Sequence, residues 1–340
     1  MKRRDFLKAT AGGAAAALCG VGSAEARENK QPLENAIGIL YDATLCVGCK
    51  ACVRACKEIN DLPPTIMGED VQYDASRGVS GTTYNVIKVY KNGTSEVKDR
   101  EIDGFSFAKK SCMHCVDPAC VSGCPVSALT KNPVSGIVQY NPDTCIGCRN
   151  CMVGCPFSIP QYEYHDAKGQ IQKCLFCNQA GVERISQGLL PGCADVCPTG
   201  ATLFGPRKDL LAEAKRRLAS KAGETYTYAR GEVNDQLHTH EKVAPEYQQH
   251  IYGEHEVGGT QVMHIAGVPL KKLGLPELPD RSYASIAEGV QHTLYKGMIA
   301  PAIALAGLAY VVKRNTSKPD QDDHHGGDNR SGSNNDRGEP

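Results

Sequence analysis

The sequence has no tryptophan, six phenylalanines among 340 residues, and no net charge, since 38 lysines and arginines balance 38 aspartates and glutamates. The equal charge totals exclude the bulk positive field that draws a protein onto nucleic acid or anionic lipid. The shortage of large aromatic side chains leaves few of them for packing. Cysteine is abundant instead, with 17 residues. A chain of this length can bury a core, so its cysteines need not form a disulfide scaffold.

The first 26 residues are typical of an export signal. MKRRDFLK places Arg3 and Arg4 before an apolar stretch of small residues, which ends in an AEA triplet that fits a cleavage site. This pattern resembles the twin-arginine signal, whose route carries folded proteins across the bacterial inner membrane. We expect residues 1–26 to be removed together with Cys19, and the mature protein to begin near Arg27.

The remaining sixteen cysteines fall into four groups of four. Groups one and three, CVGCKACVRAC and CIGCRNCMVGC, follow the C-x2-C-x2-C-x3-C run with which bacterial ferredoxins hold cubane iron–sulfur clusters. Groups two and four, CMHCVDPACVSGC and CLFC with CADVC, also contain four cysteines each. Three thiolates in seven residues let one tight loop wrap a single cubane, and Gly48 and Gly147 permit that curvature.

The fourth cysteine of each group follows the third after three intervening residues. We expect the chain to enter a short helix there, so that this cysteine ligates a different cluster. The groups then pair reciprocally. Groups two and three lie close in sequence and form one unit, which leaves groups one and four as the other. The predicted ligand sets are site 1 (Cys46, Cys49, Cys52, Cys197), site 2 (Cys56, Cys174, Cys177, Cys193), site 3 (Cys112, Cys115, Cys120, Cys155) and site 4 (Cys124, Cys145, Cys148, Cys151).

Two other uses of sixteen cysteines are less consistent with this pattern. Zinc ribbons present two well separated CxxC knuckles, not three cysteines in seven residues. Disulfide frameworks are usual in small domains that lack a core. His114 lies between two cysteines of group two, but every quartet is already complete. We therefore expect His114 to adjust a cluster's potential through polarity or hydrogen bonding.

The segments around the cysteines predict further elements. Residues 57–111 form an insertion in which YNVIKVYKNG and GFSFAKKSC alternate as strands around Asn92 and Gly93. DLLAEAKRRLASKAG has helical spacing and predicts a packed surface helix. With this helix, the cluster-bearing domain spans 27–221. Residues 222–291 are polar, with scattered proline and glycine, and predict an extended wrapping region with short strands such as TQVMHIAG.

An uncharged run, GMIAPAIALAGLAYVV, lies near the end of the chain. Its sixteen residues fall short of the roughly 20 that span a bilayer, but Thr293 to Lys296 extend the helix, so we predict a transmembrane segment at 292–314. Lys313 and Arg314 follow it and place that end in the cytoplasm. Residues 315–340 are predicted to be a disordered cytoplasmic tail. The clusters then lie on the periplasmic face.

The four cysteine groups in this order resemble the four-cluster electron-transfer subunits of respiratory oxidoreductases over residues 38–205. That family serves formate dehydrogenases, dimethyl sulfoxide and polysulfide reductases, nitrite-reduction systems and hydrogenases. The twin-arginine signal, GLLPGCADVCPTGATLFG and the C-terminal QHTLYKGMIAPAIALAGLAYVVKRN resemble the members that serve membrane-bound hydrogenases.

The resemblance implies an α+β fold with two bacterial-ferredoxin-like double-cluster units in a pseudo-two-fold relation, strand insertions and one C-terminal transmembrane helix. It implies the same pairing of groups and, because no cysteine is missing, four 4Fe-4S clusters. The chain would perform no catalysis itself. It would relay electrons from the small subunit of a periplasm-facing nickel–iron hydrogenase, which also has a large subunit, to an integral membrane subunit that reduces quinone. The alternative is the equivalent subunit of a formate dehydrogenase or a sulfur-compound or nitrite oxidoreductase.

Overall fold

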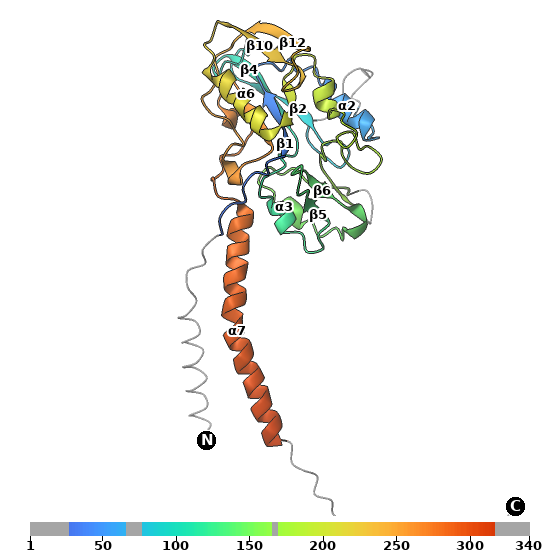
Figure 1. Ribbon diagram of the computed structural model, residues 1–340, viewed down its shortest axis with the longest axis vertical. Helices are drawn as coiled ribbons and strands as arrows, with labels where there is room; N and C mark the ends of the chain where they lie inside the picture. The colour runs from blue at the N-terminus through green and yellow to red at the C-terminus, as the bar shows by residue number, and fades with distance from the viewer. Residues whose placement is uncertain (1–26, 66–76, 165–168, 317–340) are drawn as a thin grey trace, which may run out of the picture. The chain divides into compact units, whose positions relative to one another are not determined.

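The computed structural model describes residues 27–65, 77–164 and 169–316 (Figure 1). The predicted signal at 1–26 and nearly all of the predicted tail at 315–340 lie outside the described residues. The chain divides into two compact units. The first spans residues 24–291 and holds all sixteen cysteines of the four groups, whereas the second includes residues 292–316.

A four-stranded sheet forms the centre of the first unit. Its order is β11 (Gly231–Glu232), β9 (Thr202–Pro206), β1 (Ile37–Asp42) and β13 (Val262–Ile265). β1 pairs antiparallel with β9 and parallel with β13, so that Ile39 lies opposite both Phe204 and Val262. The TQVMHIAG strand is therefore fully buried in the central sheet and does not wrap its outside.

The predicted helix after the fourth cysteine group is confirmed as α6 (Arg207–Ala219). Its apolar side packs on the sheet, where Leu210 and Ala214 join Leu40 and Met263 in one buried cluster. The buried charge of Arg217, also on α6, is paired with Asp42 at 3.0 Å and with Glu213 at 2.7 Å. Helical spacing thus places both the apolar contacts and a buried ion network against the central sheet.

Four short helices carry the cysteines. They are α2 (Ala51–Ile59), α3 (Ala119–Ser122), α4 (Asn150–Val153) and α5 (Gly192–Asp195). The third cysteine of each group lies in the first two residues of its helix, and the fourth lies one turn further along the chain. The predicted helical step between these two cysteines is therefore confirmed. α2 packs against α5, and α3 packs against α4.

The insertion contains the predicted pair of strands. β2 (Val86–Lys91) and β4 (Gly104–Lys110) run antiparallel, with Lys88 opposite Ala108. A short strand, β3 (Val97–Lys98), lies in the connection between them and pairs parallel with β4. Smaller hairpins form from β5 (Leu129–Lys131) with β6 (Val138–Tyr140), β7 (Gln161–Tyr162) with β8 (Ile171–Gln172), and β10 (Thr225–Ala229) with β12 (Thr239–Val243). The described part of this unit also contains three 3-10 turns, η1 (Pro142–Thr144), η2 (Glu256–Gly258) and η3 (Leu270–Leu273).

Arg27 joins the start of the described chain to its last folded segment. Its guanidinium donates to both carboxylate oxygens of Asp117, at 2.7 and 2.9 Å, and to Glu288 at 2.5 Å. Asp117 also accepts a hydrogen bond from the hydroxyl of Ser282 at 2.6 Å, and its side chain is 1% exposed. This buried carboxylate holds residue 27 and residues 282–288 against the loop that carries group two.

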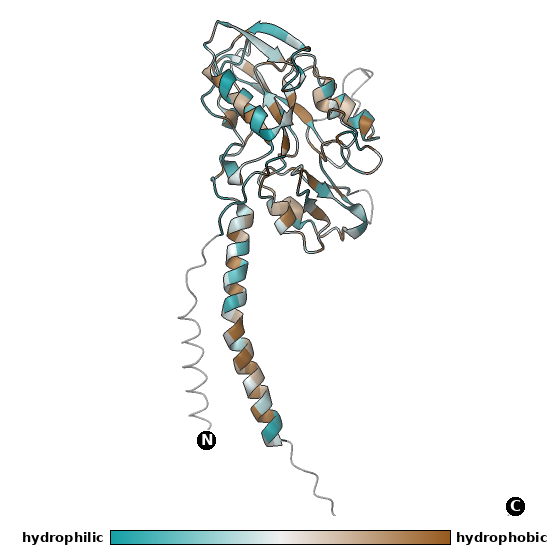
Figure 2. Ribbon diagram, viewed as in Figure 1, coloured by the Kyte–Doolittle hydropathy of each residue, from teal (hydrophilic) through white to brown (hydrophobic). Residues whose placement is uncertain are grey.

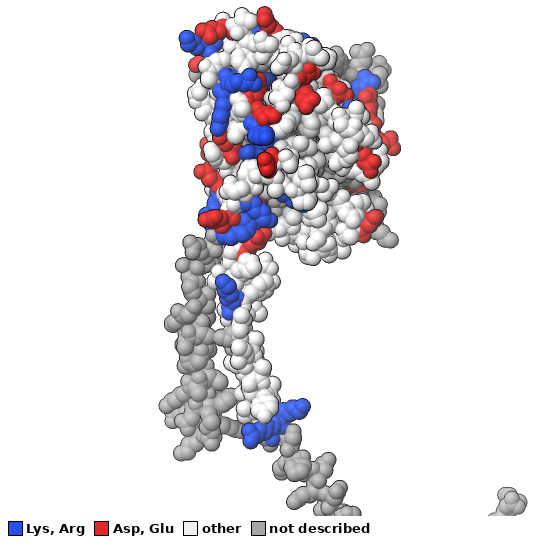
Figure 3. All heavy atoms as spheres, viewed as in Figure 1, with Lys and Arg blue, Asp and Glu red and all other residues white. Residues whose placement is uncertain are grey.

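Helix α7 (Tyr283–Thr316) is longer than the segment predicted at 292–314. Residues Tyr283–Arg314 are long and apolar enough to cross a membrane, and 18 consecutive residues within them have a mean hydropathy of 1.5. Figure 2 shows the apolar residues along the helix, and Figure 3 shows basic side chains at its end, where Lys313 and Arg314 lie. Its first nine residues, 283–291, belong to the first unit.

Candidate iron–sulfur sites

Site 1 is a cavity of about 320 Å³ lined by Cys46, Cys49, Cys52 and Cys197. The loop that supplies the first three thiols turns through Gly48 at φ 71° and Lys50 at φ 59°. A Cβ at Gly48 would lie 2.2 Å from the ring of Phe107, so the loop passes that ring too closely for any side chain. The cavity therefore depends on both the glycine and the insertion strand that carries Phe107.

Site 4 repeats this construction. Cys124, Cys145, Cys148 and Cys151 line a cavity of about 310 Å³. Gly147 has φ 67° and Arg149 has φ 64°, at the positions that correspond to those of Gly48 and Lys50 in group one. Both loops thus use the same backbone conformation to aim three thiols at one space. Each loop is followed by a short helix that carries the third thiol.

Site 2 is a cavity of about 390 Å³ lined by the four predicted thiols, Cys56, Cys174, Cys177 and Cys193. Cys112, which the sequence assigns to site 3, lines the same cavity. Burial raises the pKa of Cys174, and the charges of Cys56, Cys177, Cys193 and Cys112 raise it further. Site 2 therefore brings together its own quartet and adjoins site 3.

The thiols of site 3 lie close to one another. Burial raises the pKa of Cys115 well above its ordinary value, and the charges of Cys120, Cys155 and Cys112 add to the shift. Burial also raises the pKa of Cys155. The backbone N–H groups of residues 157–159 donate hydrogen bonds to its sulfur, which lower the pKa and offset part of the effect of burial. Those amides directly follow Pro156 and would stabilise a ligand thiolate.

The quartets of sites 1, 2 and 4 each line a cavity rather than meet at a point. Within the described residues, no three His, Cys, Asp or Glu side chains are placed to hold a single metal ion. The three cavities have similar volumes, from about 310 to about 390 Å³ when the space open to solvent is included. Four thiols around such a cavity fit a cubane cluster better than a tetrahedral zinc ion, whose ligands lie about 2.3 Å from one centre.

Burial disfavours the deprotonated, thiolate form of these cysteines. It raises the pKa of Cys52, Cys56 and Cys120 to about 12. Metal binding displaces the thiol proton, so iron in the sites would supply the positive charge that stabilises the thiolates. We therefore expect apoprotein and cluster-loaded protein to differ in stability.

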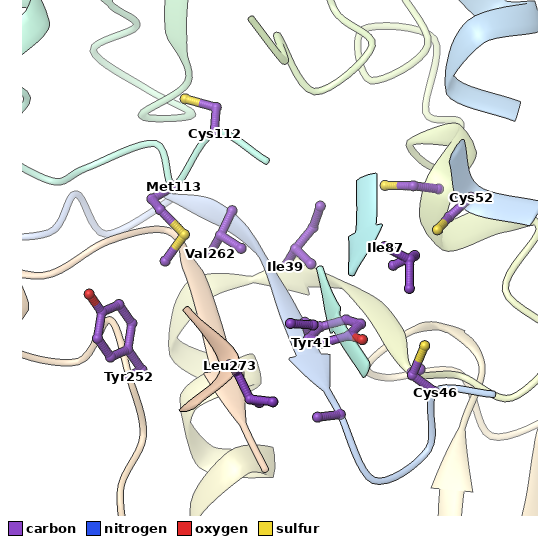
Figure 4. Packing of buried hydrophobic residues seen from close by; sticks show 14 of the residues in the cluster. Ile39, Tyr41, Cys46, Cys52, Ile87, Cys112, Met113, Tyr252, Val262 and Leu273 are labelled. Carbon is purple, nitrogen blue, oxygen red and sulfur yellow. The ribbon is translucent and has the colours of Figure 1, made fainter. Parts of the chain in front are cut away.

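The four sites form a row. α2 gives Cys52 to site 1 and Cys56 to site 2. Cys193 in α5 lines site 2, and Cys197, two residues after the end of α5, lines site 1. α3 and α4 connect sites 3 and 4 in the same way through their third and fourth cysteines. Between sites 2 and 3, the rings of His114 and Phe176 meet edge to face at 4.2 Å. Figure 4 shows Cys112 separated from Cys46 and Cys52 by apolar side chains of one core cluster.

The two ends of the row reach the surface. Cys49 in site 1 and Cys148 in site 4 are exposed, whereas none of the eight thiols of sites 2 and 3 is. Each exposed cysteine has an exposed apolar residue two positions before it. Val47 is 55% exposed, and Ile146 is 65% exposed. Sites 1 and 4 are therefore the terminal sites, and sites 2 and 3 are enclosed by protein.

His114 is buried, with an exposed fraction of 1%. Its Nδ1 accepts a hydrogen bond from the backbone N–H of Val138 at 3.1 Å, which leaves the proton of the neutral ring on Nε2. Burial lowers its pKa well below the ordinary value, and the charges of Lys173 and Lys131 lower it further. His114 is thus a neutral residue between sites 2 and 3, and the expectation that it adjusts a cluster's potential stays a prediction.

Sequence reasoning missed three lysines beside the sites. Lys131 donates to the backbone oxygen of Cys115 at 2.8 Å, and Lys173 donates to that of Cys174 at 3.1 Å. Lys109 lines the cavity of site 2. Burial lowers the pKa of Lys109, but the charges of Cys193 and Cys52 outweigh this effect and raise it overall. Strand alternation was the available signal, since it places Lys109 and Lys110 on opposite faces of β4.

Two family models match the chain. A 4Fe-4S dicluster domain covers residues 104–207, and a 4Fe-4S binding domain covers residues 43–67. The hydrogenase-2 operon protein HybA of Escherichia coli O157:H7 is 50% identical over 96% of this chain and 99% of that protein. The predicted resemblance to the iron–sulfur proteins that serve membrane-bound hydrogenases is confirmed by this similarity to a hydrogenase-2 operon protein.

More distant relatives serve another enzyme. The iron–sulfur subunit of the nitrate-inducible formate dehydrogenase of E. coli K12 is 31% identical over 84% of this chain and 89% of that subunit. The formate dehydrogenase-O iron–sulfur subunit of the same strain is 33% identical over 79% of this chain and 78% of that subunit. With the two family models, these similarities support multiple 4Fe-4S clusters in the chain described above.

Proposed function

Because the chain belongs to the family of iron–sulfur electron-transfer subunits that includes HybA and the formate dehydrogenase subunits, we propose that it relays electrons for a hydrogenase through four 4Fe-4S clusters. One observation carries the proposal. Three separate cavities are each lined by one predicted quartet, and each quartet combines thiols of two groups. The clusters would accept and release electrons, and the chain would perform no bond-making chemistry of its own.

The assignment of ligands follows the four predicted quartets. In sites 1 and 4 the equivalent loop conformations support two ferredoxin-like units related by a pseudo-two-fold axis. The chain's own residues would hold each cluster by four thiolates, donate backbone hydrogen bonds to sulfur and exclude water from sites 2 and 3. Enclosure by protein favours transfer along the row over loss of electrons to solvent.

The two exposed ends suggest where electrons enter and leave. The globular unit passes into α7 beside Asp117 and Ser122, in the segment that supplies thiols to sites 3 and 4. We infer that site 4 faces the integral membrane subunit, which reduces quinone. Site 1, at the other end of the row, then faces the small subunit of the nickel–iron hydrogenase, whose large subunit oxidises hydrogen.

Export and anchoring complete the proposal. Residues 1–26 would direct the folded protein through the twin-arginine route, and α7 would anchor it with Lys313 and Arg314 on the cytoplasmic side. The cluster-bearing unit would then lie in the periplasm. Truncation after Lys296 should release the isolated chain from membranes washed with carbonate. A truncated chain that stays in the membrane pellet would contradict the anchor.

The decisive experiment is metal and sulfide analysis of the full, natively matured chain after it has been separated from the partners with which it was purified. We expect about sixteen iron atoms and sixteen acid-labile sulfides per chain, as four 4Fe-4S clusters require. A colourless preparation with about four zinc ions and no sulfide would refute the cluster assignment. A nickel–iron subunit among the co-purified proteins is the result expected for a hydrogenase.

The alternative is the same role in a formate dehydrogenase. It is favoured by the 31% and 33% identity to formate dehydrogenase iron–sulfur subunits. The higher identity to HybA favours the hydrogenase. Finding a molybdenum subunit in place of the nickel–iron subunit in the detergent-solubilised complex would decide for the alternative.

A further inference from the structure

Lys109 is a buried cation without an adequate partner. Its residue is 3% exposed, and it lies in β4 with Ala108 and Lys110 on the opposite face of the strand. In the part of the chain that the structure describes, its ammonium has one hydrogen bond, to Asn85 Oδ1 at 3.4 Å. No described carboxylate lies within ion-pair distance of it. An ammonium has three donors, so at least two of them have no strong protein acceptor.

Other buried cations of this unit are satisfied differently. Arg217 has two carboxylates, at 3.0 and 2.7 Å. Lys173 donates to the backbone oxygens of Val138 at 2.5 Å and Cys174 at 3.1 Å. Because an unpaired buried charge costs several kcal/mol, a counter-charge for Lys109 must come from elsewhere.

The counter-charge available to Lys109 is the content of site 2. Lys109 lines that cavity together with the four thiols of site 2. Asn85, which accepts its hydrogen bond, donates its own amide to the backbone oxygen of Cys52 at 2.9 Å. Lys109 therefore stands at the junction of site 1 and site 2, on the side of the insertion strands that faces both.

We propose that Lys109 donates hydrogen bonds to the cluster held in site 2 and raises the reduction potential of that cluster. Lys109 is thus a positioning residue, because it makes site 2 a more favourable place for an electron in the row of sites. A cluster held by four thiolates is negatively charged, and reduction adds one more negative charge. A fixed cation in a low-dielectric interior stabilises the reduced form more than the oxidised form. Site 1 is affected in the same direction but less strongly, because its cavity is not lined by Lys109.

The variants that test this inference are Lys109→Met, Lys109→Arg and the matched control Lys110→Met, which removes a charge from the next residue on the opposite face. Each is made in the full complex, and the clusters are followed by electron paramagnetic resonance during a redox titration. The paramagnetic resonance signal that changes in the Cys177→Ser variant is assigned to site 2. For Lys109→Met, we expect the equilibrium constant for reduction of site 2 to fall at least about tenfold, which is about 59 mV for one electron.

The controls separate charge from packing. Lys109→Arg keeps the charge and should stay within about threefold of the wild type at site 2, and Lys110→Met should do the same. An unchanged site 2 in Lys109→Met, with its clusters complete, would overturn the inference. An equal shift in Lys110→Met would also overturn it, because the effect would then be one of general surface charge.

A measurement on the wild type covers the case in which Lys109→Met loses its clusters. In protein labelled with ¹⁵N-lysine, pulsed electron paramagnetic resonance should show a weak coupling between the electron spin of the reduced cluster in site 2 and a lysine nitrogen. Absence of that coupling would refute direct donation. The inference rests on the proposed function, since site 2 must hold a cluster. Iron and sulfide analysis tests that premise separately, so the two failures are distinguishable.

Discussion

Replacing Cys197 with serine tests the crossed ligation, because Cys197 and Cys193 lie four residues apart around α5 and yet line different cavities. Cys197 lines site 1 with Cys49, whereas Cys193 lines site 2 with Cys177. The Cys197→Ser variant should therefore disturb the same cluster as Cys49→Ser. The Cys193→Ser variant should disturb the same cluster as Cys177→Ser.

The amount of iron and sulfide that the variant should lose follows from the number of sites. A site holds about four of the sixteen iron atoms expected, so complete loss removes about a quarter of the iron and sulfide that this chain holds. If three thiolates retain a smaller cluster, the loss falls to about one iron atom. Iron analysis gives the amount, and resonance spectra of the reduced complex identify the cluster. If Cys197→Ser and Cys177→Ser remove the same signal, the crossed assignment is wrong.

Three further predictions concern stability and loop geometry. Arg217→Met removes the buried arginine that pairs with Asp42 and with Glu213, and should lower the free energy of unfolding by about 3–5 kcal/mol. Arg216→Met removes an exposed arginine and leaves Glu213 paired with Arg217, so it should cost less than about 1 kcal/mol in the same denaturant titration. Burial lowers the pKa of His264 to about 3 in the folded chain. Between pH 6.5 and pH 3, the unfolded chain therefore binds a proton at this residue that the folded chain does not bind. Stability is therefore lost as the pH falls from 6.5 towards 3. His264→Phe should remove about 2 kcal/mol of the difference between pH 7 and pH 5, and an unchanged difference would refute this origin. Gly48→Ala should cost site 1 its cluster because a Cβ there lies 2.2 Å from the ring of Phe107. Gly147→Ala should retain more iron at site 4 because the nearest atom to its Cβ, the hydroxyl of Tyr162, is 3.3 Å away. Equal losses in iron analysis would contradict this comparison.

The thiols that line the cavities of sites 1, 2 and 4 could be predicted because their geometry is local, whereas the ligation of clusters by the four quartets stays a prediction. A loop of seven residues and one helical turn fix where four thiols point, so the spacing of Cys46 to Cys56 already contains the arrangement that the structure shows. The short helix α2 and the positive φ of Gly48 follow from the same few residues. Reciprocal pairing needed only the additional fact that groups two and three are near in sequence.

The contact between sites 2 and 3 could not be predicted in this way. Cys112 and Cys174 are 62 residues apart, and they meet because the insertion strands and the central sheet bring their loops together. The burial of Lys109 was equally hidden. Alternation separates Lys109 from Lys110, but only tertiary packing decides which of the two faces the interior.

The central sheet has a consequence for the order of biosynthesis. β1 lies between β9 and β13, and its residue Ile39 pairs with Val262, which is more than two hundred positions later. A nascent chain can wind the early cysteine loops as soon as they emerge, but the strand beneath them keeps one unpaired edge until Ile265 has left the ribosome. Completion of the fold is thus postponed almost to the end of the globular unit, and a chain stalled before that point exposes an open sheet edge to chaperones and proteases.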